Sequence, residues 1–254
     1  MIGAIIGDIV GSRFEFHNHK SKEFDLFTDE CFFTDDTVMT LAVAKSLMDG
    51  TDVVKEMKRL GQLYPGAGWG AGFGRWLFSD SNEPYYSFGN GAAMRVSAAA
   101  YVAGSITEAI VLSRKVTEVT HDHPEGIKGA EAVTVAIYCA LHGWNKEQIK
   151  GAIKQFYYDI DFTLDEIRDS YKFNETCQGS VPQALEAFFE SENFEDAIRN
   201  AISIGGDSDT IAAITGSVAE AYYGVPAWIR DRALDFLDVS LGAILYDFEK
   251  RFGC

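Results

Sequence analysis

The sequence predicts an all-α protein, and two observations support this class. Apolar residues recur with the 3.6-residue period of a helix along most of the 254 residues, whereas strand-like stretches are few and short. Ala, Leu, Glu and Lys fill these windows, and Gly, Pro, Asn or Asp separate most of them. We therefore expect many medium-length helices joined by short loops. The predicted helices span 37–48, 52–63, 92–103, 106–119, 124–142, 181–190, 194–204, 209–223 and 227–237.

Glycine marks two segments for different reasons. Gly3, Gly7 and Gly11 recur every four residues in an apolar N-terminal helix, so three positions without side chains share one face. Another backbone can approach that face closely, and we expect this helix to be central. The glycine-rich segment 66–74 completes no G-x-G-x-x-G register, and no strand precedes it. We expect it to be a loop that borders a ligand.

Size and charge set the class of partner. A chain with 47% hydrophobic residues can bury a substantial core, and no linker or repeat divides it, so we expect one domain over residues 1–254. The formal charge of -16 repels nucleic acid and anionic membrane surfaces at long range. A small anion could still bind where a metal ion or a helix N-terminus reverses the local sign.

Cysteine usage and the N-terminal segment indicate a cytoplasmic, soluble protein. Cys31, Cys139, Cys177 and Cys254 form no CxxC pair, so neither a zinc site nor a disulfide framework is expected. The apolar first residues have no basic segment before them, and Asp8 interrupts them as a signal sequence would not. No apolar run is long enough to suggest a membrane span.

Two acidic motifs open predicted helices. They are Thr34-Asp35-Asp36-Thr37 and Asp207-Ser208-Asp209-Thr210, and each taken alone is typical of a helix cap. Each motif nevertheless holds two carboxylates and two hydroxyl groups, which is more than a cap needs and calls for a counter-charge. Such oxygen ligands suit Mg²⁺, Mn²⁺ or Ca²⁺. The residues alone leave open whether the two motifs meet.

With these motifs, the chain resembles the ADP-ribosylglycohydrolase family. Five segments that occur in this order carry the resemblance: Gly7-Asp8-Ile9-Val10-Gly11 with Glu15; Thr34-Asp35-Asp36-Thr37; Gly89-Asn90-Gly91-Ala92-Ala93-Met94-Arg95; Thr120-His121 with Pro124; and Gly205-Gly206-Asp207-Ser208-Asp209-Thr210 leading to Gly216. The resemblance implies a single compact domain of orthogonally packed helices, which agrees with the helical periodicity.

The resemblance also implies an enzyme that cleaves the glycosidic bond between ADP-ribose and an acceptor, which is a protein side chain or another ADP-ribosylated molecule. Nucleic acid would be a partner only as such a substrate. Two Mg²⁺ or Mn²⁺ ions would hold the ribose and polarise the attacking water. The catalytic candidates are Glu15, Asp36 and Asp209. The implied metal ligands are Thr34, Asp35, Asp36, Asp207, Asp209 and Thr210.

Several further residues are expected to bind the substrate. The backbone N–H groups of Gly89, Asn90 and Gly91 would hold a diphosphate, although the same residues could simply form a helix-opening turn. The remaining substrate-binding candidates are Met94, His121 and Ser208, the last of which shapes the metal loop.

The chain departs from the family pattern in two respects. It is shorter than most characterised members, which puts the acceptor in doubt. Glu220 stands where a small residue is expected, which could reflect local packing.

Three other classes of protein are weighed against this one. A metal-dependent amidohydrolase would use the H-x-H of His121 and His123, but its barrel needs strands that the sequence lacks. A serine hydrolase would use Ser208, but no His lies nearby in the sequence to activate it. The third alternative is a catalytically inactive ADP-ribose-binding or structural relative with the same fold.

Overall fold

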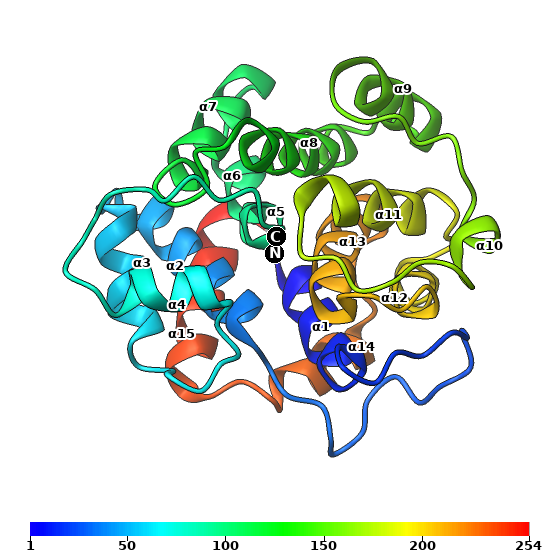
Figure 1. Ribbon diagram of the computed structural model, residues 1–254, viewed down its shortest axis with the longest axis horizontal. Coiled ribbons are helices and arrows are strands. Elements are labelled where there is room, and N and C mark those ends of the chain that lie inside the picture. Colours follow the sequence, from blue (N-terminus) through cyan, green and yellow to red (C-terminus); the bar gives the residue numbers. More distant parts are fainter. Residues whose placement is uncertain (254) are drawn as a thin grey trace.

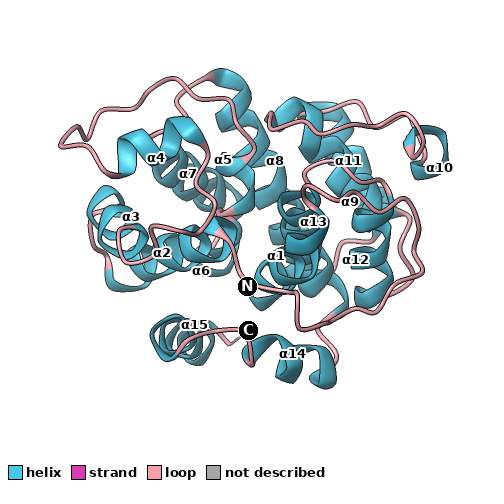
Figure 2. Ribbon diagram, turned by 60° about the horizontal axis from the view of Figure 1, so that its bottom comes forward, coloured by secondary structure: helices cyan, strands magenta, loops and turns pink. Residues whose placement is uncertain are grey.

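The computed structural model describes residues 1–253, and over these residues it consists of helices and loops with no strand (Figures 1 and 2). An isolated antiparallel bridge pairs Gly89 with Thr176. The prediction of an all-α fold is confirmed. The helices are α1 (Ile2–Gly11), the 3-10 helix η1 (Ser12–Phe14), α2 (Asp35–Asp49), α3 (Val53–Gly61), α4 (Ala71–Leu77), α5 (Gly91–Met94), α6 (Ser97–Val102), α7 (Ile106–Thr117), α8 (Pro124–Leu141), α9 (Lys146–Phe156), α10 (Leu164–Ile167), α11 (Cys177–Phe189), α12 (Phe194–Ser203), α13 (Ser208–Tyr223), α14 (Ala227–Leu234) and α15 (Val239–Phe252).

Helix α1 is entirely buried and lies against α13 in the middle of the molecule (Figure 1). A Cβ added at Gly7 would come within 2.0 Å of the carbonyl oxygen of Ala212, and one at Gly11 within 2.4 Å of the Cα of Asp209. The two backbones therefore touch where the glycines lack side chains. Because the helices are antiparallel, the C-terminal end of α1 meets the N-terminal end of α13.

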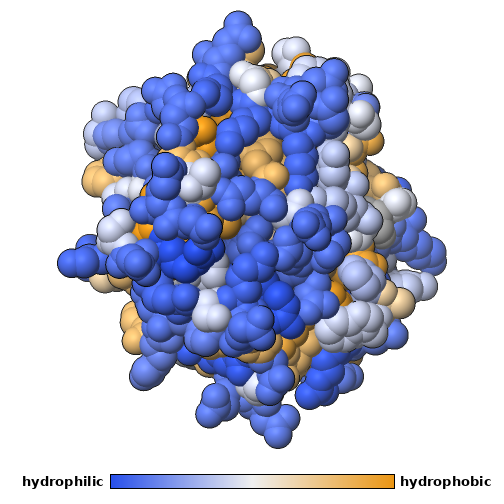
Figure 3. Space-filling view, turned by 90° about the vertical axis from the view of Figure 1, so that its right-hand side faces the viewer, coloured by the Kyte–Doolittle hydropathy of each residue, from blue (hydrophilic) through white to orange (hydrophobic). Residues whose placement is uncertain are grey.

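The other helices surround this pair. Helices α2, α3 and α4 lie on one side of it and α11 and α12 on the other, while α14 and α15 lie beneath (Figures 1 and 2). Helix α8 packs against α7, α11 and α13 and closes the remaining side. The surface near α9, α10 and α12 is mostly hydrophilic, with small separate apolar areas (Figure 3).

Some helices differ from the prediction for identifiable reasons. The predicted helix 92–103 is broken into α5 and α6 at Arg95 and Val96, where the side chain of Arg95 turns into the interior. Helices α4, α9, α10 and α15 were not predicted. Helix α9 does carry a local signal, because the side chains of Asn145 and Gln148 form a reciprocal capping box at its start.

The departure at Glu220 has a structural explanation. Its carboxylate accepts a hydrogen bond of 2.7 Å from the backbone N–H of Gly3, in the first turn of α1. Helix α1 has no side-chain cap of its own, and its buried N–H groups need an acceptor. Glu220 on α13 supplies one, so this residue reflects the packing of the two central helices.

Among residues 1–253, none of the helices has both the length and the apolar character that crossing a membrane requires. Cys31, Cys139 and Cys177 are buried free thiols. Cys254 lies outside the described residues.

Candidate active site

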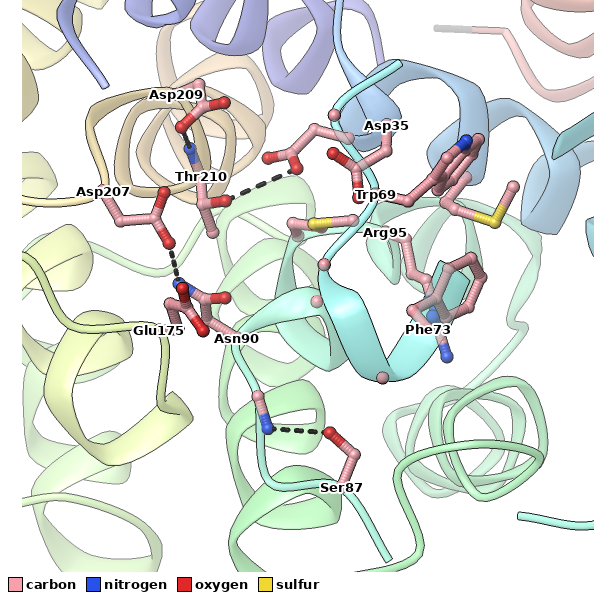
Figure 4. Close-up of a pocket in the computed structure, with 18 of the residues that line it drawn as sticks. Asp35, Trp69, Phe73, Ser87, Asn90, Arg95, Glu175, Asp207, Asp209 and Thr210 are labelled. Carbon is pink, nitrogen blue, oxygen red and sulfur yellow. Dashed lines mark hydrogen bonds between the residues drawn. The ribbon is translucent and has the colours of Figure 1, made fainter. Parts of the chain in front are cut away.

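The two acidic motifs meet in the structure. One precedes and begins α2 and the other precedes and begins α13, and the Thr210 hydroxyl lies 3.4 Å from Asp36 Oδ1, to which it donates, across 174 positions of the chain (Figure 4). Carboxylate oxygens of Glu15, Asp207 and Asp209 all lie within 4.8 Å of one another. The packing of α1 on α13 and α2 thus joins clusters that the sequence alone left separate.

These residues line a cavity of about 430 Å³. Its wall includes Gly68, Gly70 and Gly72 of the glycine-rich segment and the turn that begins α5. The backbone N–H of Asp35 donates to the carbonyl of Ala67 at 2.8 Å, which ties this segment to the first acidic motif. The segment lines the cavity, and its contact with a ligand stays a prediction. The prediction of a loop is wrong for the last residues of the segment, because α4 begins at Ala71. The carboxylate residues of the wall are Glu15, Asp35, Asp36, Glu175, Asp207 and Asp209.

The carboxylates have little positive charge near them. Burial, and then the charge of neighbouring carboxylates, raises the pKa values of Asp35, Asp36 and Asp209 well above the usual range. Arg95 is the one lysine or arginine in the described lining. The Oδ2 atom of Asp36 is buried and has no hydrogen-bond partner among the described residues. An oxygen-only donor set with an orphaned carboxylate oxygen fits a hard divalent cation.

Asp8, whose role the sequence analysis missed, supports the first motif from behind. Its fully buried carboxylate accepts hydrogen bonds from the backbone N–H groups of Thr34 and Thr37, at 2.9 and 3.0 Å, and from both hydroxyl groups. A charged residue within an apolar helix was the available signal. Its partners lie 26 and 29 positions away and could not be assigned from spacing.

Asn90 supports the second motif. Its side-chain amide donates to Asp207 Oδ2 at 2.7 Å and to the Ser180 hydroxyl at 3.1 Å (Figure 4). The backbone N–H of Asn90 already donates to the carbonyl of Glu175, and the backbone N–H of Gly89 donates to the Ser87 hydroxyl. Of the three N–H groups expected to bind a diphosphate, only that of Gly91 has no acceptor among the described residues.

His121 lies on the same wall of the cavity, and its ring is a neutral hydrogen-bond donor. Arg95 Nη2 donates to the Thr120 hydroxyl at 2.7 Å, and this hydroxyl lies 2.8 Å from His121 Nδ1. Because the hydroxyl accepts from Arg95, its own proton is directed to Nδ1, and the ring proton is assigned to Nε2. Burial and the charge of Arg95 lower the pKa of His121 well below its usual value. The Nε2–H faces the turn at Gly89 and Gly91.

Most of the expected site residues line the cavity, including Met94, but two do not. Thr34 lies behind the wall, where its hydroxyl donates to Asp8 and accepts from the N–H of Asp36. Ser208 is fully buried, and its hydroxyl faces the carbonyls of Phe14 and Gly206 at 3.5 Å. The roles of both residues in binding stay predictions. The lining also includes Glu175 and the aromatic Phe16, Tyr85 and Phe173, which were not predicted. Trp69 and Phe73 line it as well, and they belong to the glycine-rich segment that was expected to border a ligand.

Comparison with known proteins identifies the class of protein to which this fold and this site belong. The sequence model of the ADP-ribosylglycohydrolase family matches residues 1–248, so the chain belongs to that family. The expected family and fold are confirmed, and with them the assignment as an enzyme of this class.

Particular relatives extend this finding. The chain is 27% identical to ADP-ribosylhydrolase ARH3 of Mus musculus, over 89% of this chain and 83% of that protein. It is also 26% identical to ADP-ribosylarginine hydrolase Tri1 of Pseudomonas putida, over 67% of this chain and 46% of that protein. A solved structure, the ADP-ribosylglycohydrolase-related protein complex, superposes with a TM-score of 0.73 at 22% identity and covers 98% of this chain and 95% of its own. That structure shows the shared fold.

Proposed function

We propose that the chain is a dimetal-dependent hydrolase that releases ADP-ribose from an ADP-ribosylated acceptor. The observation that carries the proposal is the meeting of the two acidic motifs in one cavity, linked by the contact between Thr210 and Asp36. Family membership supports the reaction class, and the names of the relatives support ADP-ribosylated substrates.

Six of the eight residues in the two motifs are the proposed metal ligands. Five of them line the cavity, namely Asp35, Asp36, Asp207, Asp209 and Thr210, and the sixth is Thr34. When bound, two Mg²⁺ or Mn²⁺ ions would supply positive charge that holds the ribose hydroxyl groups and polarises a water. Four carboxylates balance two divalent ions, which agrees with the scarcity of cationic side chains in the wall. Thr34 would act as a ligand only if its hydroxyl contributed a lone pair while still donating to Asp8.

Glu15 is the proposed acid–base or water-positioning residue. Its side chain is half-buried beside Asp207 and Asp209, between the buried acidic motifs and solvent. Burial, followed by the charges of Asp207, Asp8 and Glu175, raises its pKa to about 7. In the metal-free chain a carboxyl group in this range can both take up and release a proton near neutral pH, and bound divalent ions would lower its pKa. This suits cleavage of a glycosidic bond through an oxocarbenium-like transition state.

The opposite wall can receive the rest of the substrate. Gly91, whose N–H has no acceptor among residues 1–253, and His121 both line the cavity, and their N–H groups can donate to anionic oxygen atoms of a diphosphate. Neither donor depends on a basic patch. A chain with a net charge of -16 can therefore bind a small anion while repelling nucleic acid. A cytoplasmic location is part of this proposal.

In the deciding experiment, the purified chain is incubated with ADP-ribosylated arginine, ADP-ribosylated serine and ADP-ribosylated nucleic-acid ends. Each substrate is tested with Mg²⁺, with Mn²⁺ and with a chelator. We expect release of ADP-ribose from at least one substrate and loss of that activity with the chelator. Activity that survives the chelator would contradict the metal requirement. ADP-ribose binding without turnover of any substrate would favour an inactive binding relative.

A further inference from the structure

Asn18 connects the segment that carries Glu15 to the second acidic motif. Its side-chain nitrogen lies 2.9 Å from the carbonyl oxygen of Glu15 and 3.0 Å from that of Phe14, and it also donates to the carbonyl of Gly206 at 2.8 Å. Its side-chain oxygen accepts from the N–H of Gly206 at 2.8 Å. One exposed side chain therefore pairs with both backbone polar groups of Gly206 and with the turn that holds Glu15.

The glycines before Asp207 make this pairing possible. Gly205 and Gly206 adopt φ values of +64° and +82°, which disfavour residues with a side chain. A Cβ added at Gly205 would lie 2.9 Å from the side-chain oxygen of Asn18, and one at Gly206 would lie 2.4 Å from the ring of Tyr171. The paired glycines thus create a surface on which the Asn18 amide fits, directly before the acidic residues.

The side chain of Glu15 needs such support. Its carboxylate makes no hydrogen bond with any residue of the described chain, and it lies beside the like-charged Asp207. Its place over the second motif therefore depends on its backbone. Beyond Asn18, the Lys20 ammonium donates to three backbone carbonyls, those of Arg168, Tyr171 and Ile204, at 2.7, 2.8 and 2.5 Å. These hydrogen bonds fasten the far end of the segment, and none of them involves Glu15.

We propose that Asn18 is a positioning residue that holds Glu15 over Asp207 and Asp209. The inference rests on the proposed function, because it assumes that Glu15 acts in metal binding or catalysis. Asn18 touches neither the carboxylates nor the cavity, so it acts only through the backbones of Glu15 and Gly206. Partners that orient metal-site residues from outside typically contribute 10- to 100-fold to metal affinity or activity.

Single variants test the contacts. Asn18→Ala removes all of them, whereas Asn18→Asp keeps the acceptor for Gly206 N–H and turns an oxygen toward the three carbonyls. We expect both variants to bind Mn²⁺ about 10- to 100-fold more weakly, measured by electron paramagnetic resonance of free Mn²⁺, and Asn18→Asp to be the weaker binder. His17→Ala and His17→Asp are matched controls, because His17 is exposed and makes no side-chain hydrogen bond within residues 1–253. Asn18 variants that match these controls would overturn the inference.

A double-mutant cycle with Glu15→Gln separates positioning from general destabilisation. We expect Asn18→Ala to lower Mn²⁺ affinity and kcat/KM in the unaltered chain and to cause little further loss in the Glu15→Gln background. Fully additive losses would show that Asn18 acts independently of Glu15 and would overturn the inference. A Glu15→Gln variant that behaves as the unaltered chain would instead overturn the proposed role of Glu15, and the positioning role with it. Impaired Glu15→Gln with normal Asn18→Ala would refute the positioning role alone.

Discussion

The carboxylate of Asp8 accepts hydrogen bonds from both the backbone N–H and the hydroxyl of Thr34, at 2.9 and 2.7 Å. A residue in the middle of a buried helix thereby caps the start of α2 and sets the direction in which Asp35 and Asp36 leave it. The first acidic motif is consequently shaped by α1, which also supplies the contact with α13.

Asp8→Asn should weaken metal binding even though Asp8 does not line the cavity. An amide of the same shape must turn its NH₂ group either toward the Thr34 hydroxyl, which then has to accept instead of donate, or toward the N–H groups of Thr34 and Thr37, which then lose their acceptor. We expect Mn²⁺ affinity to fall about 10- to 100-fold, measured by titration calorimetry. Asp49→Asn, at the exposed C-terminal end of α2, is the control. Unchanged affinity in Asp8→Asn would limit Asp8 to capping the helix.

Asp209→Asn should abolish hydrolysis while preserving the fold. Asp209 is fully buried among like charges, and Asp207 rather than Asp209 occupies the N-cap position of α13. Removing one negative charge therefore relieves repulsion in the metal-free protein, and the side-chain oxygen of the asparagine can keep the hydrogen bond that the Thr210 N–H donates to Asp209. We expect the melting temperature in chelator to stay the same or rise, with no measurable turnover in Mg²⁺ or Mn²⁺. Unfolding of this variant would instead assign Asp209 a structural role.

The metal-free protein should lose stability as the pH rises. Burial and neighbouring carboxylates raise the pKa values of Asp35, Asp36 and Asp209, and the pKa of Glu15 rises from 4.5 to about 7. A group whose pKa is higher in the folded chain stabilises the fold below its unfolded pKa, and this contribution is lost as the pH rises through the folded pKa. For Glu15 that window lies between pH 4.5 and about 7.

Thermal unfolding at pH 5 and pH 8, with chelator and with Mn²⁺, checks this prediction. In chelator we expect the lower melting temperature at pH 8. Mn²⁺ should raise the melting temperature more at pH 8 than at pH 5, because ionised carboxylates bind the metal and bound ions stabilise only the folded chain. The Asp209→Asn variant should show a smaller difference between the two pH values in chelator. A metal-free melting temperature that does not fall from pH 5 to pH 8 would argue against an uncompensated acidic cluster.

The parts of the site that could be predicted are those formed by residues that are neighbours in the sequence. The two acidic motifs are visible because each concentrates oxygen ligands at a helix start, and the family resemblance joined them. The supporting contacts are non-local: Asn18 reaches Gly206 across 188 positions, and Asn90 reaches Asp207 across 117. No spacing rule predicts such pairs, because they depend on how the central helices pack.

In the fold, too, local features could be predicted from the sequence and features that depend on tertiary contacts could not. The glycine period of α1 correctly predicted a close helix contact, since a missing side chain is a local property. The break at Arg95 was not predicted, because alanines on both sides favour a continuous helix. The tertiary contacts of the guanidinium with Thr120, His121 and the ring of Phe73 oppose it. Tertiary contacts thus override helix propensity beside the turn at Gly89 and Gly91.

Gly7→Ala should destabilise the protein, although alanine favours helices. A Cβ at this position would lie 2.0 Å from the carbonyl oxygen of Ala212, so α1 and α13 would have to separate. Overpacking of this kind costs about 1–3 kcal/mol or more, which exceeds the gain of about 1 kcal/mol in helix propensity. Gly151→Ala in α9 is the matched control, because nothing lies within 4 Å of its added Cβ, and it should be stabilising. Denaturant unfolding of both variants in chelator measures the difference. A stable Gly7→Ala variant would contradict the close contact of α1 with α13 and, with it, the mechanism that brings the two acidic motifs together.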